Sequence, residues 1–289
     1  MPPRPIPSNL FALSPLGHLV RRQRPMVVGT DFAGTVEEVG RNVTAFKPGD
    51  EVFGAARGAF AEYVSVAANA AGVVRKPAGV SFEDAATLAV AGSTALQALR
   101  DHGRVQSGQR VLVNGGSGGV GTFAVQIARA FGAEVTAVCS PRNVELDRGL
   151  GAGTVIDYTR EDFTESGKRY DLMLDIAGSH SFGDCTRVLG RGATYVLVGA
   201  AAVQHGKGGT RRALGRFLGA RLGSIASGHR AVTFMAKLRN DDLEFLGVLV
   251  ASGRVKPVIE RTYELADVPE ALRRIDEGHN QGKLAIVLQ

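Results

Sequence analysis

Three glycines with a fixed spacing carry the clearest chemical signal in this sequence. Gly116, Gly118 and Gly121 fit the pattern G-x-G-x-x-G, and they join an apolar run at 111–113 to a stretch with helical periodicity that ends at Gly132. Between a strand and a helix, such glycines permit, in that order, a tight turn, the approach of a pyrophosphate, and close packing of helix on strand. The start of the helix adds unpaired N–H groups and the positive end of its dipole. The pattern therefore predicts that a dinucleotide binds this turn, with contacts from Gly116, Ser117, Gly118, Gly119, Val120 and Gly121.

The end of the next expected strand, at 134–139, indicates which dinucleotide binds. An NAD site places Asp or Glu about 20 residues beyond the glycines, where it bonds the ribose 2′-hydroxyl. This chain has Ser140, Arg142 and Asn143 there, and its first acid is Glu145. A hydroxyl, a guanidinium and an amide suit a 2′-phosphate, which arginine can bind through two parallel hydrogen bonds. These residues predict NADPH as the cofactor, and the alternative is that they form a solvated turn.

Metal-ligating and acid–base residues form no recognisable group in the sequence. The six histidines are scattered, Cys139 and Cys185 have no base beside them, and no C-x-x-C pair is present. We therefore expect no metal, and we assign no catalytic residue. Hydride transfer does not require one, because the cofactor carries the chemistry and the protein positions it.

Composition limits the class of protein. The chain has 289 residues, of which 44% are hydrophobic and 21% charged, as is typical of a globular protein large enough for two domains. No apolar run reaches the roughly 20 residues of a membrane span, so we expect no membrane partner. Two cysteines cannot form a disulfide framework, which favours the cytoplasm. The net charge of +6 favours an anionic partner, and a nucleotide satisfies it as well as a nucleic acid does.

The first part of the chain is rich in strand and turn signals. Residues 1–25 are rich in proline and arginine and contain no acid, so we expect a flexible or atypically folded leader. Ser81 with Asp84 predicts a helix that is broken at Gly92 and followed by a second helix at 94–102. Before these helices, turn residues separate short strands expected at 32–39, 51–53, 60–66 and 72–75.

The second part alternates strands and helices, which implies parallel pairing and a doubly wound sheet. Its strands are expected at 111–113, 134–139, 154–156, 171–176 and 194–198. The remaining pattern predicts a helix at 241–252 capped by Asn240, a strand at 258–265, a helix from Pro269 and a strand at 284–288. We therefore expect a leader at 1–25, a β-rich substrate domain at 26–90 and 254–289, and an inserted dinucleotide-binding domain at 91–253.

Short segments spread over the chain carry a family resemblance. They are GTDFAGTVEEVG at 29–40, KPGDEVFG at 47–54, FAEYV at 60–64, AGSTAL at 91–96, the unit at 111–132, VIDY at 155–158 and GK at 282–283. The chain resembles the medium-chain dehydrogenase/reductase superfamily, specifically its zinc-independent branch similar to quinone oxidoreductases. The resemblance implies an α/β fold with a Rossmann doubly wound parallel sheet inserted in a GroES-like β domain. It also implies hydride transfer from NADPH to a small-molecule substrate, a quinone or an α,β-unsaturated carbonyl.

The resemblance adds contacts with the cofactor outside the glycine-rich turn. By their match to family segments, Thr94 approaches the nicotinamide, Tyr158 the adenine, and Lys283 the cofactor side of the cleft. Gly199, at the end of the fifth expected strand, lets the nicotinamide ribose pass closely. The residues alone allow other roles, since Thr94 could cap a helix, Tyr158 could be a partly buried aromatic residue, and Lys283 an exposed lysine.

Two departures from the family concern activity. Zinc-dependent relatives carry a histidine where this chain has Thr30, which is not a useful zinc ligand. Asp31, beside it, lines the cleft or caps a turn. Relatives also have strands before the segment that starts at Gly29, where this chain has its proline-rich leader. We therefore expect an incomplete β domain that binds cofactor and turns over weakly.

Other functions stay open at this point. A zinc-independent alcohol dehydrogenase is the alternative within enzymes. A cofactor-binding protein with little turnover is an alternative of another class, and it could bind RNA through the basic stretch at 205–230. That stretch has Phe217 as its one aromatic residue, whereas single strands need stacking platforms, so we do not expect nucleic acid as a partner. A homodimer through the edge of the Rossmann sheet is the assembly that the resemblance suggests.

Overall fold

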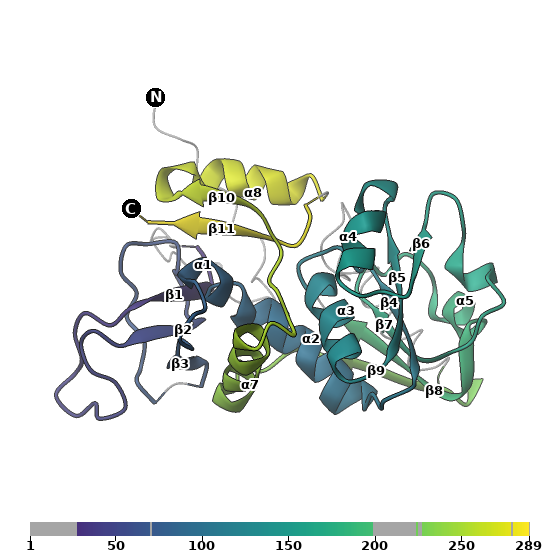
Figure 1. The fold of residues 1–289 in the computed structure, drawn as a ribbon, viewed down its shortest axis with the longest axis horizontal. Helices are drawn as coiled ribbons and strands as arrows, with labels where there is room; N and C mark the ends of the chain where they lie inside the picture. Colours follow the sequence, from purple (N-terminus) through teal and green to yellow (C-terminus); the bar gives the residue numbers. More distant parts are fainter. Residues whose placement is uncertain (1–27, 70, 199–223, 225–226, 279, 289) are drawn as a thin grey trace, which may run out of the picture.

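The computed structural model describes residues 28–69, 71–198, 224, 227–278 and 280–288, and Figure 1 shows their arrangement. Strands β1 to β3 and the C-terminal elements lie on one side, and the strands β4 to β9 lie on the other. None of the helices in these ranges has the length and apolar composition that a bilayer-spanning helix needs.

The larger sheet is parallel and has six strands in the order β6-β5-β4-β7-β8-β9. The direction of winding reverses between β4 and β7, which makes the crevice at the carboxyl ends of these strands the expected ligand site. The doubly wound sheet predicted from the sequence is confirmed. Its strands are β4 Arg110–Asn114, β5 Glu134–Cys139, β6 Thr154–Asp157, β7 Tyr170–Asp175, β8 Leu189–Val198 and β9 Arg230–Phe234.

This sheet is buried on both faces, which explains the continuous apolar runs of its strands. Val111 and Val113 pack in one core cluster with Phe123 of helix α3 (Gly121–Ala130). Leu112, which points to the opposite face, packs in a second cluster with Met173 of β7. The short helices η3 (Pro141–Asn143), α4 (Val144–Gly149), η4 (Phe163–Glu165) and α5 (Phe182–Thr186) connect the strands.

The β-rich part contains two small sheets. One is antiparallel, with β1 (Asp31–Thr35), β2 (Glu51–Ala55) and β3 (Val73–Arg75) in that order. The other pairs β10 (Ile259–Glu264) with β11 (Lys283–Val287) in parallel, and the 3-10 helix η5 (Leu265–Asp267) and α8 (Val268–Asp276) connect these strands. In Figure 1 these C-terminal elements, in yellow, lie beside β1 and α1.

The strand predicted at 60–66 is wrong. This segment forms no strand in the structure, although the N–H of Phe60 donates to the carbonyl of the distant Val28 (3.0 Å). Its ring packs on Gly29, where a Cβ would lie 2.5 Å from the Phe60 backbone nitrogen and φ is 99°. The strand predicted at 32–39 is shorter in the structure, where β1 ends at Thr35.

The helical connection between the two parts is continuous where a break was predicted. Ser81 caps α1 (Phe82–Ala85) as expected, since its Oγ accepts from the N–H of Asp84 (3.1 Å). The chain then runs as a helix through π-helical and α-helical turns, η1 (Leu88–Gly92), α2 (Ser93–Gln97) and η2 (Ala98–Gly103). The break at Gly92 is wrong because this glycine serves packing, since a Cβ there would lie 3.0 Å from Leu246 Cδ1 of α7.

Helix α7 (Asn240–Ala251) begins without the cap that the sequence predicts. Asn240 does not cap its own helix, because its Oδ1 accepts from the N–H of Gly72 (2.6 Å) and ties α7 to the turn before β3. The cap position is Arg239, whose side chain makes no capping hydrogen bond.

Candidate active site

The glycine-rich turn connects β4 to α3 at the carboxyl edge of the large sheet. Gly115, with φ of 95°, makes the left-handed step of this turn. Its N–H and that of Gly116 both donate to the carbonyl of Val138, at 3.0 and 3.1 Å. Gly116, to which the sequence pattern assigned the tight turn, lies in the same turn without a left-handed backbone. Gly116 is required for another reason, because a Cβ there would lie 2.7 Å from Asp147 Oδ2.

The space around the other two glycines is compatible with the roles that the spacing predicts. A Cβ on Gly121 would lie 2.0 Å from the carbonyl oxygen of Gly115, so a glycine is needed for α3 to start this close to the turn. A Cβ on Gly118 would have its nearest neighbour, the same oxygen, 3.7 Å away. Gly118 therefore faces open space that a pyrophosphate can occupy, next to the first N–H groups of a ten-residue helix.

A cleft of about 2010 Å³ opens between this turn and the β-rich part. It exceeds the roughly 300–1,000 Å³ of a typical small-molecule pocket, so it has room for a dinucleotide and a second molecule. Thr94, Gly116 and Gly121 do not line it, and Gly199 lies outside the described residues. The predicted site residues that line it are Ser117, Gly118, Gly119, Val120, Ser140, Arg142, Asn143, Tyr158 and Lys283.

Thr94 has its hydroxyl turned away from the cleft. The hydroxyl donates to the carbonyl of Val90 (2.6 Å), one turn earlier in the same helical connection, and the residue is 9% exposed. This bond lies within the helical connection and is not the capping role that the residue alone allowed, and the approach of Thr94 to a nicotinamide stays a prediction.

Asn143 braces the turn rather than facing solvent. It is buried, its Nδ2 donates to Ser117 Oγ (2.7 Å), and its Oδ1 accepts from Gln281 Nε2 (2.5 Å). The N–H of Gly282 also donates to the carbonyl of Ser117 (2.9 Å). The glycine-rich turn is thereby joined to the segment before β11. No sequence signal pointed to this contribution of Gln281.

Arg142 and Tyr158, which follow β5 and β6, have exposed side chains. Arg142 is exposed and makes no hydrogen bond with another residue in the described ranges, and its charge helps to lower the pKa of Glu260. Tyr158 is 57% exposed, and its N–H donates to the carbonyl of Cys139 (3.2 Å). Both side chains can therefore meet a ligand that lies across the ends of these strands.

Lys283 and Asp31 meet on the other side of the turn. Lys283 Nζ lies 3.5 Å from Asp31 Oδ2, and a Cβ on Gly119 would lie 3.3 Å from Lys283 Cδ. Asp31 Oδ1 accepts from the N–H of Val90 (3.2 Å). Burial raises the pKa of Asp31, and the charge of Lys283 opposes this effect. Asp31 therefore both lines the cleft and bonds the backbone of η1, so the two roles left open by the sequence occur together.

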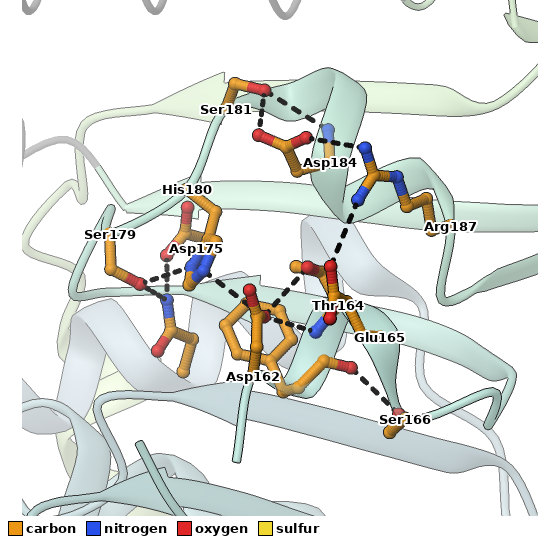
Figure 2. A network of polar contacts seen from close by, with 12 residues as sticks. Asp162, Thr164, Glu165, Ser166, Asp175, Ser179, His180, Ser181, Asp184 and Arg187 are labelled. Carbon is orange, nitrogen blue, oxygen red and sulfur yellow. Dashed lines mark hydrogen bonds and ion pairs between the residues drawn. The ribbon is translucent and has the colours of Figure 1, made fainter. Parts of the chain in front are cut away.

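A polar network that the sequence reasoning missed holds the turn after β7, as Figure 2 shows. Asn114 Nδ2 donates to Asp175 Oδ1 (2.8 Å) and to Ser179 Oγ (3.1 Å). Ser179 Oγ lies 2.9 Å from His180 Nδ1, and His180 Nε2 lies 3.3 Å from Asp162 Oδ1. A polar residue at the end of each of two neighbouring parallel strands was the available signal.

This network shapes the wall of the cleft. Ser179 and His180 line the cleft, and a Cβ on Gly115 would lie 3.3 Å from the backbone nitrogen of Ala177. Tyr195 adds a hydrogen bond from its hydroxyl to Asp175 Oδ2 (2.6 Å). The two loops that leave β4 and β7 are therefore held against each other at the reversal of strand order.

Comparisons with known proteins agree with this geometry. Residues 8–78 match the alcohol dehydrogenase GroES-like domain, and residues 150–286 match the family described as zinc-binding dehydrogenase. The chain is 37% identical over 283 residues to the mitochondrial NAD(P)H oxidoreductase RTN4IP1 of Mus musculus, covering 91% of this chain and 70% of that protein. It is 36% identical to the trans-enoyl reductase pgmF of Aspergillus terreus, covering 91% and 77%.

A solved structure gives the same relation. The Escherichia coli quinone oxidoreductase complexed with NADPH superimposes with a TM-score of 0.76 at 25% identity, covering 93% of this chain and 84% of that one. This chain belongs to the medium-chain dehydrogenase/reductase superfamily of oxidoreductases, in its quinone-oxidoreductase-like group.

Proposed function

We propose that this protein is an NADPH-dependent oxidoreductase that delivers hydride to a quinone or an α,β-unsaturated carbonyl and uses no zinc. One observation carries the choice of cofactor. The end of β5 presents Ser140 and Arg142 to the cleft, and no carboxylate stands there to bind a free ribose 2′-hydroxyl. The proposed domains are a dinucleotide-binding domain at 91–253 inside a substrate domain at 26–90 and 254–289.

The residues of the cleft then have distinct tasks. N–H groups of the turn around Gly118 bind the diphosphate, Arg142 with Ser140 binds the 2′-phosphate, and Tyr158 stacks on the adenine side. Lys283 adds a positive charge beside Gly119, where it reaches the anionic cofactor. Bound NADPH would supply the hydride, and the chain positions it.

The wall of the cleft on the β-rich side supports the substrate class. Phe60, Tyr63, Phe82 and Val90 line it, and Tyr63 is 73% exposed. Such a wall suits a flat, weakly polar acceptor better than a charged one. Two relatives are named as a quinone oxidoreductase and a trans-enoyl reductase, which are enzymes of these two substrate classes.

Zinc does not fit the donor atoms that are present. Within the described ranges, no three His, Cys, Asp or Glu side chains are grouped so that they could hold a metal ion. Cys139 and Cys185 are buried in the core around the six-stranded sheet, and Thr30 stands beside Asp31. We expect elemental analysis of the purified protein, after dialysis against a chelator, to find far less than one zinc per chain. One zinc per chain would refute the zinc-free proposal.

Location and assembly are part of the proposal. We place the protein in the cytoplasm, because its two cysteines cannot form a disulfide framework, although the RTN4IP1 relatives are mitochondrial by name. We also keep a homodimer as the assembly. The basic stretch at 205–230, through which the alternative function could bind RNA, lies mostly outside the described residues.

The deciding experiment follows the oxidation of NADPH and of NADH with a panel of quinones and enones, and the reduction of NADP⁺ with primary and secondary alcohols. The proposal expects turnover with NADPH and at least one quinone or enone. Turnover with alcohols alone would favour the alcohol dehydrogenase alternative. Tight cofactor binding without turnover on any substrate would favour a binding protein.

A further inference from the structure

Asp147 is a carboxylate at a position where a helix packs on the core. It lies in α4, where it is the buried residue, and none of its surface is exposed. Carboxylates are almost never fully buried unless they are paired. Within the described part of the chain, no N–H or O–H group donates to either of its oxygens, and the Cys139 thiol is the weak donor beside it.

This carboxyl backs the glycine-rich turn directly. A Cβ on Gly116 would lie 2.7 Å from Asp147 Oδ2 and 2.9 Å from Ala137 Cβ. The glycine therefore leaves no side chain between the carboxyl and the backbone of the turn. A charge on Asp147 acts on the turn through protein rather than through water, where screening is weaker.

Among the residues that the structure describes, no cation compensates the charge of this carboxyl. Strand β5 presents the Cys139 thiol, a weak donor, and the turn at 115–121 has no titratable side chain. Burial and the neighbouring Asp147 raise the pKa of the Cys139 thiol. The charge of Asp157 in β6 adds to this rise, and the charge of Arg148 in α4 opposes it. Burial raises the pKa of Asp147 to about 6, and Cys139 opposes this rise.

We propose that Asp147 is a positioning residue that couples the affinity of the turn for its dinucleotide to pH, with tighter binding when the carboxyl is protonated. The inference rests on the proposed function, in which the diphosphate of the cofactor lies on this turn. A diphosphate and an ionised carboxylate on opposite sides of Gly116 repel each other. Binding therefore favours the protonated carboxyl and takes up a proton from solution.

The test titrates the protein with NADH by calorimetry between pH 5.5 and pH 8. NADH is the probe because the 2′-phosphate of NADPH, like other phosphomonoesters, titrates near pH 6 itself. If binding raises the pKa of Asp147 from about 6 to about 7, the dissociation constant increases about tenfold over this range. At pH 6.5, two buffers of different ionisation enthalpy should then reveal an uptake of about half a proton.

Variants assign the effect to this residue. Asp147→Asn should bind NADH with an affinity nearly independent of pH, and Asp147→Leu serves if the Asn variant does not fold. Glu145→Gln is the matched control, because Glu145 is an exposed carboxylate of the same helix, and it should behave as the wild type.

The outcomes separate this inference from the proposed function. NADH binding without pH dependence or proton uptake would overturn the role of Asp147 and leave a dinucleotide site standing. Undiminished pH dependence in both Asp147 variants would assign the proton to another group of the cleft, such as Asp31 or His180, and would also overturn it. No binding of NADH or NADPH at any pH would overturn both.

Discussion

Lys283 and Asp31, which are 252 positions apart in the chain, meet at the cleft with Nζ 3.5 Å from Oδ2. Lys283 begins the last strand and touches the glycine-rich turn at Gly119, whereas Asp31 begins the first described strand. Through these contacts the pair links the β-rich part to the glycine-rich turn. It also holds a positive charge where an anionic cofactor would need one.

This pair predicts opposite effects for two substitutions. Lys283→Met should weaken NADPH binding by about 10- to 150-fold, because a hydrogen bond to a charged group contributes about 1.5–3 kcal/mol. Asp31→Asn keeps an oxygen for the N–H of Val90 but removes the charge that competes for Lys283. It should strengthen NADPH binding severalfold at low salt. Calorimetric titration of both variants checks this, and a change in the same direction for both would contradict it.

Glycines of the turn predict a separation between folding and binding. Gly121→Ala places a Cβ 2.0 Å from the carbonyl oxygen of Gly115, and overpacking of this kind costs about 1–3 kcal/mol of unfolding free energy or more. Gly118→Ala meets nothing closer than 3.7 Å, so it should unfold near the wild-type temperature. Its methyl group nevertheless occupies the approach of the pyrophosphate, so NADPH affinity should fall at least about tenfold, the equivalent of 1.4 kcal/mol. Equal stability of the two variants would show that the turn can adjust around Gly121.

The sequence predicted well those parts of the fold in which local pattern and burial agree. Strands β4 and β5 are apolar runs beside glycine turns, and the core requires them on both faces. Strand β9 was missed because its residues are exposed or only partly buried, which leaves no continuous apolar run. The segment at 60–66 has the pattern of a strand but forms none in the structure, where the N–H of Phe60 donates to the carbonyl of Val28.

The glycine-rich turn could be predicted from the sequence, but the residues that brace it could not. The spacing of the glycines predicts the strand–turn–helix geometry because that geometry is local, and the dinucleotide itself stays a prediction. No local signal connects Gln281 to Asn143, or Lys283 to Asp31, because these contacts form only when the C-terminal segment returns to the cleft. The burial of Asp147 could not be predicted either. A charged residue in a helix is expected to be exposed, and only the tertiary fold buries this one.

Burial of Asp147 predicts how stability depends on pH. Its pKa is about 6 in the folded protein and 3.8 for an unperturbed aspartate, so the folded state binds more protons between these values. Stability therefore falls as pH rises from about 4 to about 6, by about 3 kcal/mol at 1.4 kcal/mol per pKa unit. Asp147→Asn removes this loss, so its stability relative to the wild type should improve between pH 4 and pH 7. Urea unfolding at several pH values measures this, with Glu145→Gln as the control, and a constant difference between variant and wild type would contradict it.

Arg142 predicts the preference for NADPH over NADH. It is exposed at the end of β5 and lines the cleft, and no acid occurs in the sequence between β5 and Glu145. A charge-assisted hydrogen bond to the 2′-phosphate predicts that NADPH binds about 10- to 150-fold more tightly than NADH. Arg142→Ala should remove most of this difference by weakening NADPH alone, and added salt should narrow it because the contact faces solvent. Arg148→Ala is the control, since Arg148 pairs with Glu145 and does not line the cleft. Equal affinities in the wild type, or loss of both cofactors in Arg142→Ala, would remove Arg142 from the site and favour NAD.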